Sequence, residues 1–227
     1  MFDQIRVLCW YLYYKYRPPF RSRSALLRWQ RRRLRRHLRY VAAHVPFYAE
    51  KGGPGTYPIT DKAFMRAHFR DLNTAGIGRE EAEDFAVQAE RTRDFTPQLR
   101  GITVGLSSGT SGRRGIFLIS DAEKSKWAGY ILAKFLPGRI TERYTIAFFM
   151  RADSNLYQAV GSDRIRFCFF DIYQDMETHR NRLEAIRPDI LAGQPSLLLM
   201  LAAEVEHGRL QIHPRTVISI AEVLEKT

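Results

Sequence analysis

A short polar loop at residues 106–115, L-S-S-G-T-S-G-R-R-G, holds the residue types best suited to binding phosphate. Its hydroxyls can donate hydrogen bonds, and its three glycines allow backbone N–H groups to turn toward an anion. Arg113 and Arg114 add fixed positive charge with bidentate geometry. Composition alone leaves a flexible hairpin turn as the alternative. The spacing matches neither GxxxxGK[ST] nor GxGxxG, so neither of those nucleotide-binding motifs is present.

The runs that flank this loop, 101–106 and 115–119, are typical of β-strands. Other short apolar runs predict buried strands at 144–150, 165–170, 189–193 and 216–221. Helical patterns are expected at 62–72, 79–90, 121–136, 176–186 and 197–207. The helix from Asp121 is expected to bury Trp127, Tyr130, Ile131 and Phe135. Alternating strands and helices indicate right-handed crossovers, so the expected class is α/β with a mainly parallel sheet flanked by helices.

The net charge of +12 over 227 residues is concentrated in one segment. Residues 1–40 contain twelve Lys and Arg side chains and a single acidic residue, Asp3, whereas the remainder is nearly neutral. A high positive charge usually points to nucleic acid or an anionic membrane as a partner. The chain carries no zinc-finger spacing or other nucleic-acid-binding signature, so we do not expect nucleic acid as a partner.

The basic segment divides into two expected helices on either side of Pro18 and Pro19. The first, 2–16, mixes aromatic and apolar residues and is too short for a membrane span of about 20 residues. It suits either a membrane interface or a helix that caps the core. The second, 24–44, has apolar residues spaced seven, four, three and four positions apart, which places them on one helix face: Leu27, Leu34, Leu38, Val41 and Val45. Its arginines form either a solvated face of a docked helix or an anion-binding face.

Cysteine and histidine usage restricts the chemistry further. Two cysteines exclude a disulfide scaffold, so a reducing, cytoplasmic setting is expected, with membrane association as an alternative. The six histidines lack HxxH or HExxH spacing, and we predict no metal site built by the chain itself. Cys168 lies in an apolar run and is expected in the core. Four aspartates between the strands are expected at the surface: Asp153, Asp163, Asp171 and Asp175.

The loop 107–115, S-S-G-T-S-G-R-R-G, resembles the phosphate-binding loop of the adenylate-forming superfamily, S-[SG]-G-[ST]-[TS]-G-x-P-K. Its surroundings are similar to the phenylacetate–CoA ligase-like and CapK-like branch. The segments that carry this likeness are V-P-F-Y (45–48), P-I-T-D-K (58–62), F-R-D-L-N (69–73), R-P-D-I-L-A-G-Q-P-S (187–196) and S-I-A-E-V-L (219–224). Their order across residues 45–224 makes the resemblance more specific than the loop alone.

The resemblance implies a basic, helical arm at 1–44 and an incomplete AMP-binding domain at 45–227, the N-terminal part of the large adenylation domain. It implies ATP-dependent conversion of a carboxylic acid to an acyl-adenylate, followed by transfer to coenzyme A or another thiol, with Mg²⁺ carried by ATP. The residues expected around the phosphates are Ser107, Ser108, Gly109, Thr110, Ser111, Gly112, Arg113, Arg114 and Gly115. Ala221 and Glu222 would border the adenine, and Met150 and Tyr157 would line an acyl pocket; Phe148 and Phe149 are expected in the core instead.

The sequence departs from the family pattern in two places. The loop ends in R-R-G where the family has a lysine, and arginine is no simple replacement for lysine. The family's later threonine/glutamate segment, ribose-binding aspartate and catalytic lysine would lie beyond Thr227. We therefore expect an N-terminal fragment with little adenylation activity alone. The alternatives are a non-catalytic interaction module of the same fold, and a peripheral membrane or nucleic-acid binder acting through residues 1–40.

Overall fold

The computed structural model describes residues 2–107, 114–150 and 160–223, and the remaining positions are left undescribed. The chain forms two compact units. Unit 1 comprises residues 1–17, 89–103 and 118–227, and unit 2 comprises residues 18–88 and 104–117. This division by compactness does not follow the boundary expected at residue 44. The functional division into arm and adenylation domain stays a prediction, and each unit is described by itself.

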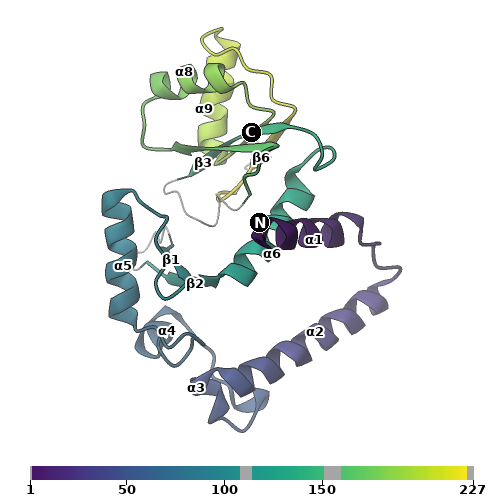
Figure 1. The fold of residues 1–227 in the computed structure, drawn as a ribbon, viewed down its shortest axis with the longest axis vertical. Helices are drawn as coiled ribbons and strands as arrows, with labels where there is room; N and C mark the ends of the chain where they lie inside the picture. The colour runs from purple at the N-terminus through teal and green to yellow at the C-terminus, as the bar shows by residue number, and fades with distance from the viewer. Residues whose placement is uncertain (1, 108–113, 151–159, 224–227) are drawn as a thin grey trace. The chain divides into compact units, whose positions relative to one another are not determined.

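Unit 1 is built on a parallel sheet of four strands in the order β4-β3-β5-β6 (Figure 1). The strands are β3 (Tyr144–Met150), β4 (Ile165–Asp171), β5 (Ile190–Gly193) and β6 (Thr216–Ser219). Helix α8 (Met176–Ile186) connects β4 to β5, and α9 (Pro195–Glu206) connects β5 to β6. These elements confirm the predicted α/β class with a parallel sheet.

Helices cover both faces of this sheet because alternate side chains of each strand point to opposite faces. One core contains Ile146 and Ile190 from the strands, together with Leu132 of α6 (Asp121–Phe135). The other contains Ala147, Phe149 and Leu191, together with side chains of α8 and α9. Phe149 is fully buried and Phe148 nearly so, which confirms that both belong to the core. Cys168 packs against the second core, as expected.

Helix α6 buries a different face from the one its aromatic residues predict. Tyr130 is 44 % exposed, and Trp127, Ile131 and Phe135 are only partly buried. The buried residues are instead Ser125, Ala128, Gly129, Leu132 and Ala133. These residues face α1 (Phe2–Tyr16), and a Cβ added to Gly129 would lie 2.5 Å from the Trp10 Cβ and 2.7 Å from the Val7 carbonyl oxygen. Small side chains therefore let the two helix backbones approach, and the large ones remain at the margins.

Two titratable side chains, His179 and Glu204, lie on the α8 and α9 face of unit 1. His179 of α8 is buried beside Phe149 and Phe170, and within the described residues neither ring nitrogen has a hydrogen-bond partner. Burial lowers the pKa of His179 below its ordinary value of 6.5. Glu204 of α9 accepts hydrogen bonds from Arg180 at 2.7 Å and from the Arg209 Nη2 at 2.7 Å, which lower its pKa to about 2.

Unit 2 contains the helical segments that precede the sheet. Helix α2 (Arg23–His44) is capped at its N-terminus by Ser22, whose hydroxyl accepts a hydrogen bond from the Ala25 N–H. A short helix, α3 (Pro46–Ala49), and a 3₁₀ turn, η1 (Pro54–Thr56), follow it. Helix α2 buries none of its residues, so the predicted docked apolar face is not found: Leu27 and Leu34 are exposed. Helices α4 (Lys62–Ala67) and α5 (Arg79–Thr92) complete the helical part.

A two-stranded sheet, β1 (Ile102–Leu106) and β2 (Ile116–Ser120), follows α5 in the chain. Gly105 of β1 lies directly under the Phe117 ring of β2, where an added Cβ would lie 2.1 Å from the ring. This pair therefore confirms the strands predicted on either side of the glycine-rich loop. Among the described residues, no helix is long and apolar enough to cross a membrane.

Candidate functional site

The glycine-rich loop is anchored at its base by hydrogen bonds that join its first and last residues. The Ser107 N–H donates to the Gly115 carbonyl at 2.7 Å, and the Gly115 N–H donates to the Ser107 Oγ at 2.7 Å. The Arg114 Nε donates to the Ser107 carbonyl at 2.9 Å, which holds the guanidinium group beside the loop. The six residues between them, Ser108, Gly109, Thr110, Ser111, Gly112 and Arg113, lie outside the described residues. The base therefore combines fixed backbone with a cationic side chain.

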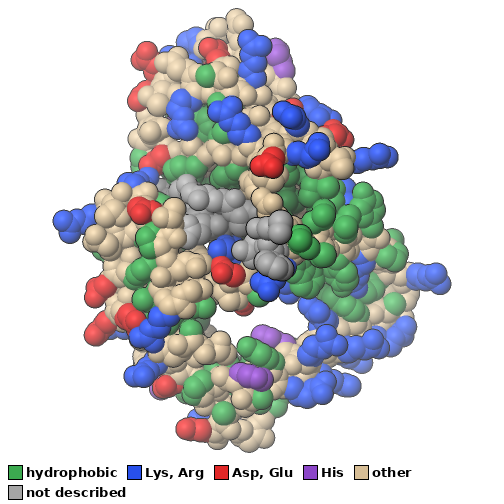
Figure 2. All heavy atoms as spheres, in the orientation of Figure 1, with side chains coloured by type: hydrophobic (Ala, Val, Ile, Leu, Met, Phe, Trp, Pro, Cys, Tyr) green, Lys and Arg blue, Asp and Glu red, His purple; other side chains and the backbone are tan. Residues whose placement is uncertain are grey.

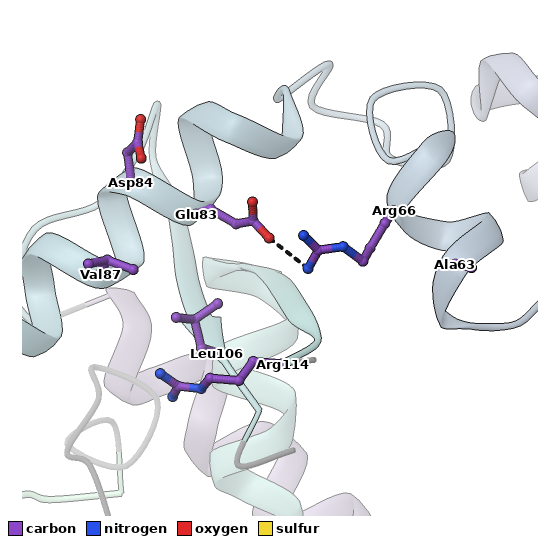
Figure 3. Close-up of a pocket in the computed structure, with 7 residues that line it drawn as sticks. All are labelled: Ala63, Arg66, Glu83, Asp84, Val87, Leu106 and Arg114. Atoms are coloured by element: carbon purple, nitrogen blue, oxygen red, sulfur yellow. Dashed lines mark ion pairs between the residues drawn. The ribbon is translucent and has the colours of Figure 1, made fainter. Parts of the chain in front are cut away.

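A cavity of about 770 Å³ lies beside this anchored base (Figure 3). Leu106 and Arg114 of the loop base line it together with residues of α4 and α5: Ala63, Arg66, Glu83, Asp84 and Val87. Arg66 pairs with Glu83 at 2.7 Å, and Arg79 pairs with the other oxygen of Glu83 at 3.0 Å. The Glu83 charge is thus satisfied by two arginines. Arg114 adds a second guanidinium group to the lining of the cavity, together with the carboxylates of Glu83 and Asp84.

The three motif segments upstream of the loop form the scaffold that holds α4. The Phe47 N–H donates to the Asp71 carbonyl at 3.0 Å, so the first and third segments meet although 23 residues separate their starts. Asp61 of the second segment caps α4 by accepting from the Phe64 N–H at 2.7 Å. The Phe47 ring packs edge-on against Phe64 at 5.2 Å. Segments recognised separately in the sequence therefore build one wall of the cavity.

Helix α4 ends at Ala67 and not near residue 72 as predicted, because Asn73 organises the following turn. Its side-chain amide donates to the carbonyls of Phe69 and Ile77, at 2.7 and 3.0 Å. Its side-chain oxygen accepts from the N–H groups of Ala75 and Ile77, both at 3.1 Å. One side chain thus satisfies four backbone groups of the turn that follows α4.

The carboxyl edge of the parallel sheet brings together the two motif segments nearest the C-terminus. Gly193 of β5 is in register with Ser219 of β6, and the Ile220 N–H donates to the Gly193 carbonyl at 2.9 Å. Just beyond, the Ser196 Oγ donates to the Glu222 carboxylate at 2.9 Å. Ligands of parallel α/β sheets bind at this edge. The turn predicted to border adenine therefore lies where such a ligand would bind in unit 1.

Three of the four remaining predicted residues, Ala221, Glu222 and Met150, have a defined place. Ala221 adopts the left-handed backbone region, with φ of 68°, and Glu222 is exposed. Met150 ends β3 opposite Asp171 of β4, at the same carboxyl edge as the Glu222 turn. Tyr157 lies outside the described residues. Loop residues 107–115 and residues 221–222 belong to different units, and the role of each in binding stays a prediction.

Sequence reasoning missed two features of these sites. The pairing of Ser196 with Glu222 joins residues 26 apart, and only the β5–β6 register reveals it. The sequence did not predict that Arg66 and Glu83 line the cavity, because charged residues of this kind are ordinary on the surface of amphipathic helices.

The described residues offer little support for a protein-built metal site. No group of three or more His, Cys, Asp or Glu side chains in residues 2–107, 114–150 and 160–223 could hold a metal ion. Asp171 pairs instead with Arg93, and Asp175 caps α8 by accepting from the Thr178 N–H at 2.8 Å. We derive no step through a metal ion.

Comparison with known proteins gives a limited result. No family model and no curated protein matches the chain. Among solved structures, an open conformation of 2-hydroxyisobutyryl-CoA ligase in complex with 2-HIB-AMP and CoA is 17 % identical, with a TM-score of 0.43 over 86 % of this chain and 49 % of that one. The same ligase in its thioesterification state is 18 % identical, with a TM-score of 0.42 over 78 % and 39 %. The chain thus spans half or less of these proteins, and at these scores neither assigns it a function.

Proposed function

We propose that this chain carries part of an adenylate-forming ligase that uses ATP to activate a carboxylic acid. The acyl-adenylate would then pass its acyl group to coenzyme A or another thiol. A relationship to phenylacetate–CoA ligase-like and CapK-like proteins rests on the sequence motifs given above.

The observation that carries the proposal is the arrangement of four motif segments in unit 2, three of which hold α4 and one of which lines the cavity beside it. Segments 45–48, 58–62 and 69–73 hold α4 in place, and α4 contributes Arg66 to the cavity wall. The fourth segment, 107–115, contributes Arg114 to the same cavity. The charged residues that line this cavity are two arginines, Arg66 and Arg114, and two carboxylates, Glu83 and Asp84.

A physical role follows for the residues of the loop. Attack of a carboxylate oxygen on the α-phosphorus forms the acyl–phosphate bond and breaks the bond to pyrophosphate, which leaves with the electron pair. This step needs no nucleophile from the protein, and it depends on positioning and on stabilising negative charge. Arg114 would stabilise charge on the leaving phosphates with its guanidinium group. Ser107 would keep the strand ends at the spacing that the loop requires.

The Glu222 turn supports a separate part of the proposal. Ser196 fixes the Glu222 carboxylate by donating a hydrogen bond at 2.9 Å, so the backbone of the turn is held against β5. We propose that Ala221 and Glu222 border the adenine and that Met150 contributes to the acyl pocket at the same sheet edge. Coenzyme A is proposed from the family resemblance alone.

The test is ATP–pyrophosphate exchange with a panel of carboxylic acids, using the chain within its natural full-length protein. We expect exchange with at least one acid, and Arg114→Gln should reduce it about tenfold or more, because a charge-assisted hydrogen bond contributes about 1.5–3 kcal/mol. Arg143→Gln, a change at an exposed arginine, is the matched control and should leave exchange unchanged. A protein that binds no ATP and exchanges with no acid would indicate a non-catalytic interaction module.

A further inference from the structure

The solvent-facing side of α1 is apolar, although α1 already buries its other side against unit 1. Val7, Tyr11 and Tyr14 pack against the core that includes α6. On the opposite side, five large apolar side chains are 41–64 % exposed: Ile5, Leu8, Leu12, Tyr13 and Tyr16. Figure 2 shows hydrophobic side chains gathered over this helix. The described residues of unit 1 leave this outer face largely exposed.

The exposed residues form one continuous stripe along α1. At about 100° per residue, Leu8, Leu12, Ile5, Tyr16 and Tyr13 fall within an arc of about 140°. Cys9 lies inside this arc and is also exposed. We call these six residues the outer stripe of α1. Its continuity distinguishes it from exposed apolar residues scattered singly, which are normal on protein surfaces.

Basic residues border the outer stripe on both sides. On the helical wheel Arg6 follows Tyr13 at one margin, and Arg17 lies just beyond the end of the helix. At the other margin Lys15 precedes Leu8, and its ammonium donates to the Leu136 carbonyl at 3.1 Å. The Arg17 guanidinium lies 5.8 Å from the centre of the Tyr13 ring. On the neighbouring α6, the Lys126 Nζ lies 5.4 Å from the Trp10 ring centre. The arrangement is an apolar strip between cations, with aromatic rings at the boundary.

We propose that the outer stripe of α1 binds the surface of an anionic phospholipid bilayer. Apolar side chains would enter the boundary between headgroups and acyl chains, and the flanking cations would meet the phosphates. Tyr and Trp favour this interface because their rings are apolar at one end and polar at the other. At 15 residues α1 would lie in the plane of the interface. A second copy of the chain fits less well, because two stripes face to face would bring like-charged margins together.

Vesicle binding of the full chain tests this proposal. We expect cosedimentation with vesicles of phosphatidylcholine and phosphatidylserine, and much weaker binding to phosphatidylcholine alone. The double variant Leu8→Gln/Leu12→Gln should weaken binding by about tenfold or more, since fully burying one leucine contributes about 1.5–3 kcal/mol. The matched control is Leu199→Gln/Met200→Gln on α9, whose side chains are 58 % and 56 % exposed, and it should bind like the unchanged protein. Circular dichroism would show that both variants remain folded.

A second readout separates insertion from adsorption through charge. With Cys168→Ala, a polarity-sensitive dye on Cys9 would report the environment of the outer stripe alone. We expect its emission to shift to the blue with phosphatidylserine vesicles and to be quenched by quenchers placed in the acyl region.

Three results would overturn the proposal. The first is an absence of binding to anionic vesicles. The second is binding that survives the leucine changes while the dye stays in water, which would assign binding to other charges. The third is a concentration-dependent dimer that the leucine changes abolish, which would show that a second copy covers the stripe.

Discussion

Gly129 marks the closest approach between α1 and α6, and Gly129→Ala tests whether this contact controls the position of α1. The added Cβ would lie 2.5 Å from the Trp10 Cβ, 2.7 Å from the Val7 carbonyl oxygen and 2.8 Å from the Tyr11 nitrogen. Two of these three atoms belong to the α1 backbone, so no side-chain rotation can relieve the overlap. The helices would have to separate by about 1 Å to restore ordinary contact distances.

The expected change in stability is the difference between two opposing terms. Overpacking typically costs about 1–3 kcal/mol, and backbone overlap places this site toward the upper end. Replacing a mid-helix glycine by alanine gains about 1 kcal/mol in helix propensity. We therefore predict a net loss of about 1–2 kcal/mol in the free energy of unfolding.

Urea denaturation followed by tryptophan fluorescence would measure this loss. Gly78→Ala is the matched control, because its added Cβ meets no atom within 4 Å and its backbone is not left-handed; its effect should stay within about 0.5 kcal/mol. A Gly129→Ala variant that is more stable than the unchanged protein would refute the close contact, because helix propensity alone would then explain the result.

Two further predictions concern pH in unit 1. Because burial lowers the pKa of His179, its imidazole binds a proton more readily in the unfolded chain than in the folded one. The free energy of unfolding should therefore fall as the pH drops below 6.5. His179→Phe should flatten that part of a plot of unfolding free energy against pH. Arg209 and Arg180 lower the pKa of Glu204 to about 2, so its stabilising effect is complete above pH 4.5 and is lost as the pH falls toward 2. Glu204→Gln should reduce the urea midpoint at pH 7 and weaken its acid dependence over that range, whereas an unchanged pH profile would show that the two arginines do not hold this carboxylate in solution.

The sequence predicts the sheet well because its strands carry a strong local signal. Runs such as 144–150 are short, apolar and rich in β-branched or aromatic residues, and each corresponds closely to a strand. The start of α2 agrees with the presence of a capping residue, Ser22. The parallel arrangement followed from the alternation of strands and helices.

Prediction failed where the packing partner decides the outcome. The buried face of α6 consists mostly of small residues, with Leu132 as its one large member, and small residues give a weak periodic signal. The close approach of α1 at Gly129 explains why this face is small. The apolar positions of α2 predicted a docked face, yet Leu27 and Leu34 are exposed. The end of α4 depended on four hydrogen bonds of one side chain, Asn73. Periodicity cannot anticipate such a turn.

The candidate site could be predicted only in part, for a similar reason. The loop 107–115 was recognised from its residue types and its family resemblance. Its anchoring through Ser107 and Gly115 agrees with the strands expected on either side. The participation of Arg66 and Glu83 in the cavity depends on how α4 and α5 pack, which a local pattern does not record.

The central claim, that Ser107 to Gly115 binds the phosphates of a nucleotide, is tested most directly by equilibrium binding of ATP to the purified chain. Titration calorimetry should show binding of ATP, competition by pyrophosphate, and much weaker binding of adenosine. Arg114→Gln should weaken ATP binding by about tenfold or more, while Arg143→Gln should not. A folded chain that binds no ATP, or an Arg114→Gln variant that binds ATP as tightly as the unchanged chain, would contradict the claim.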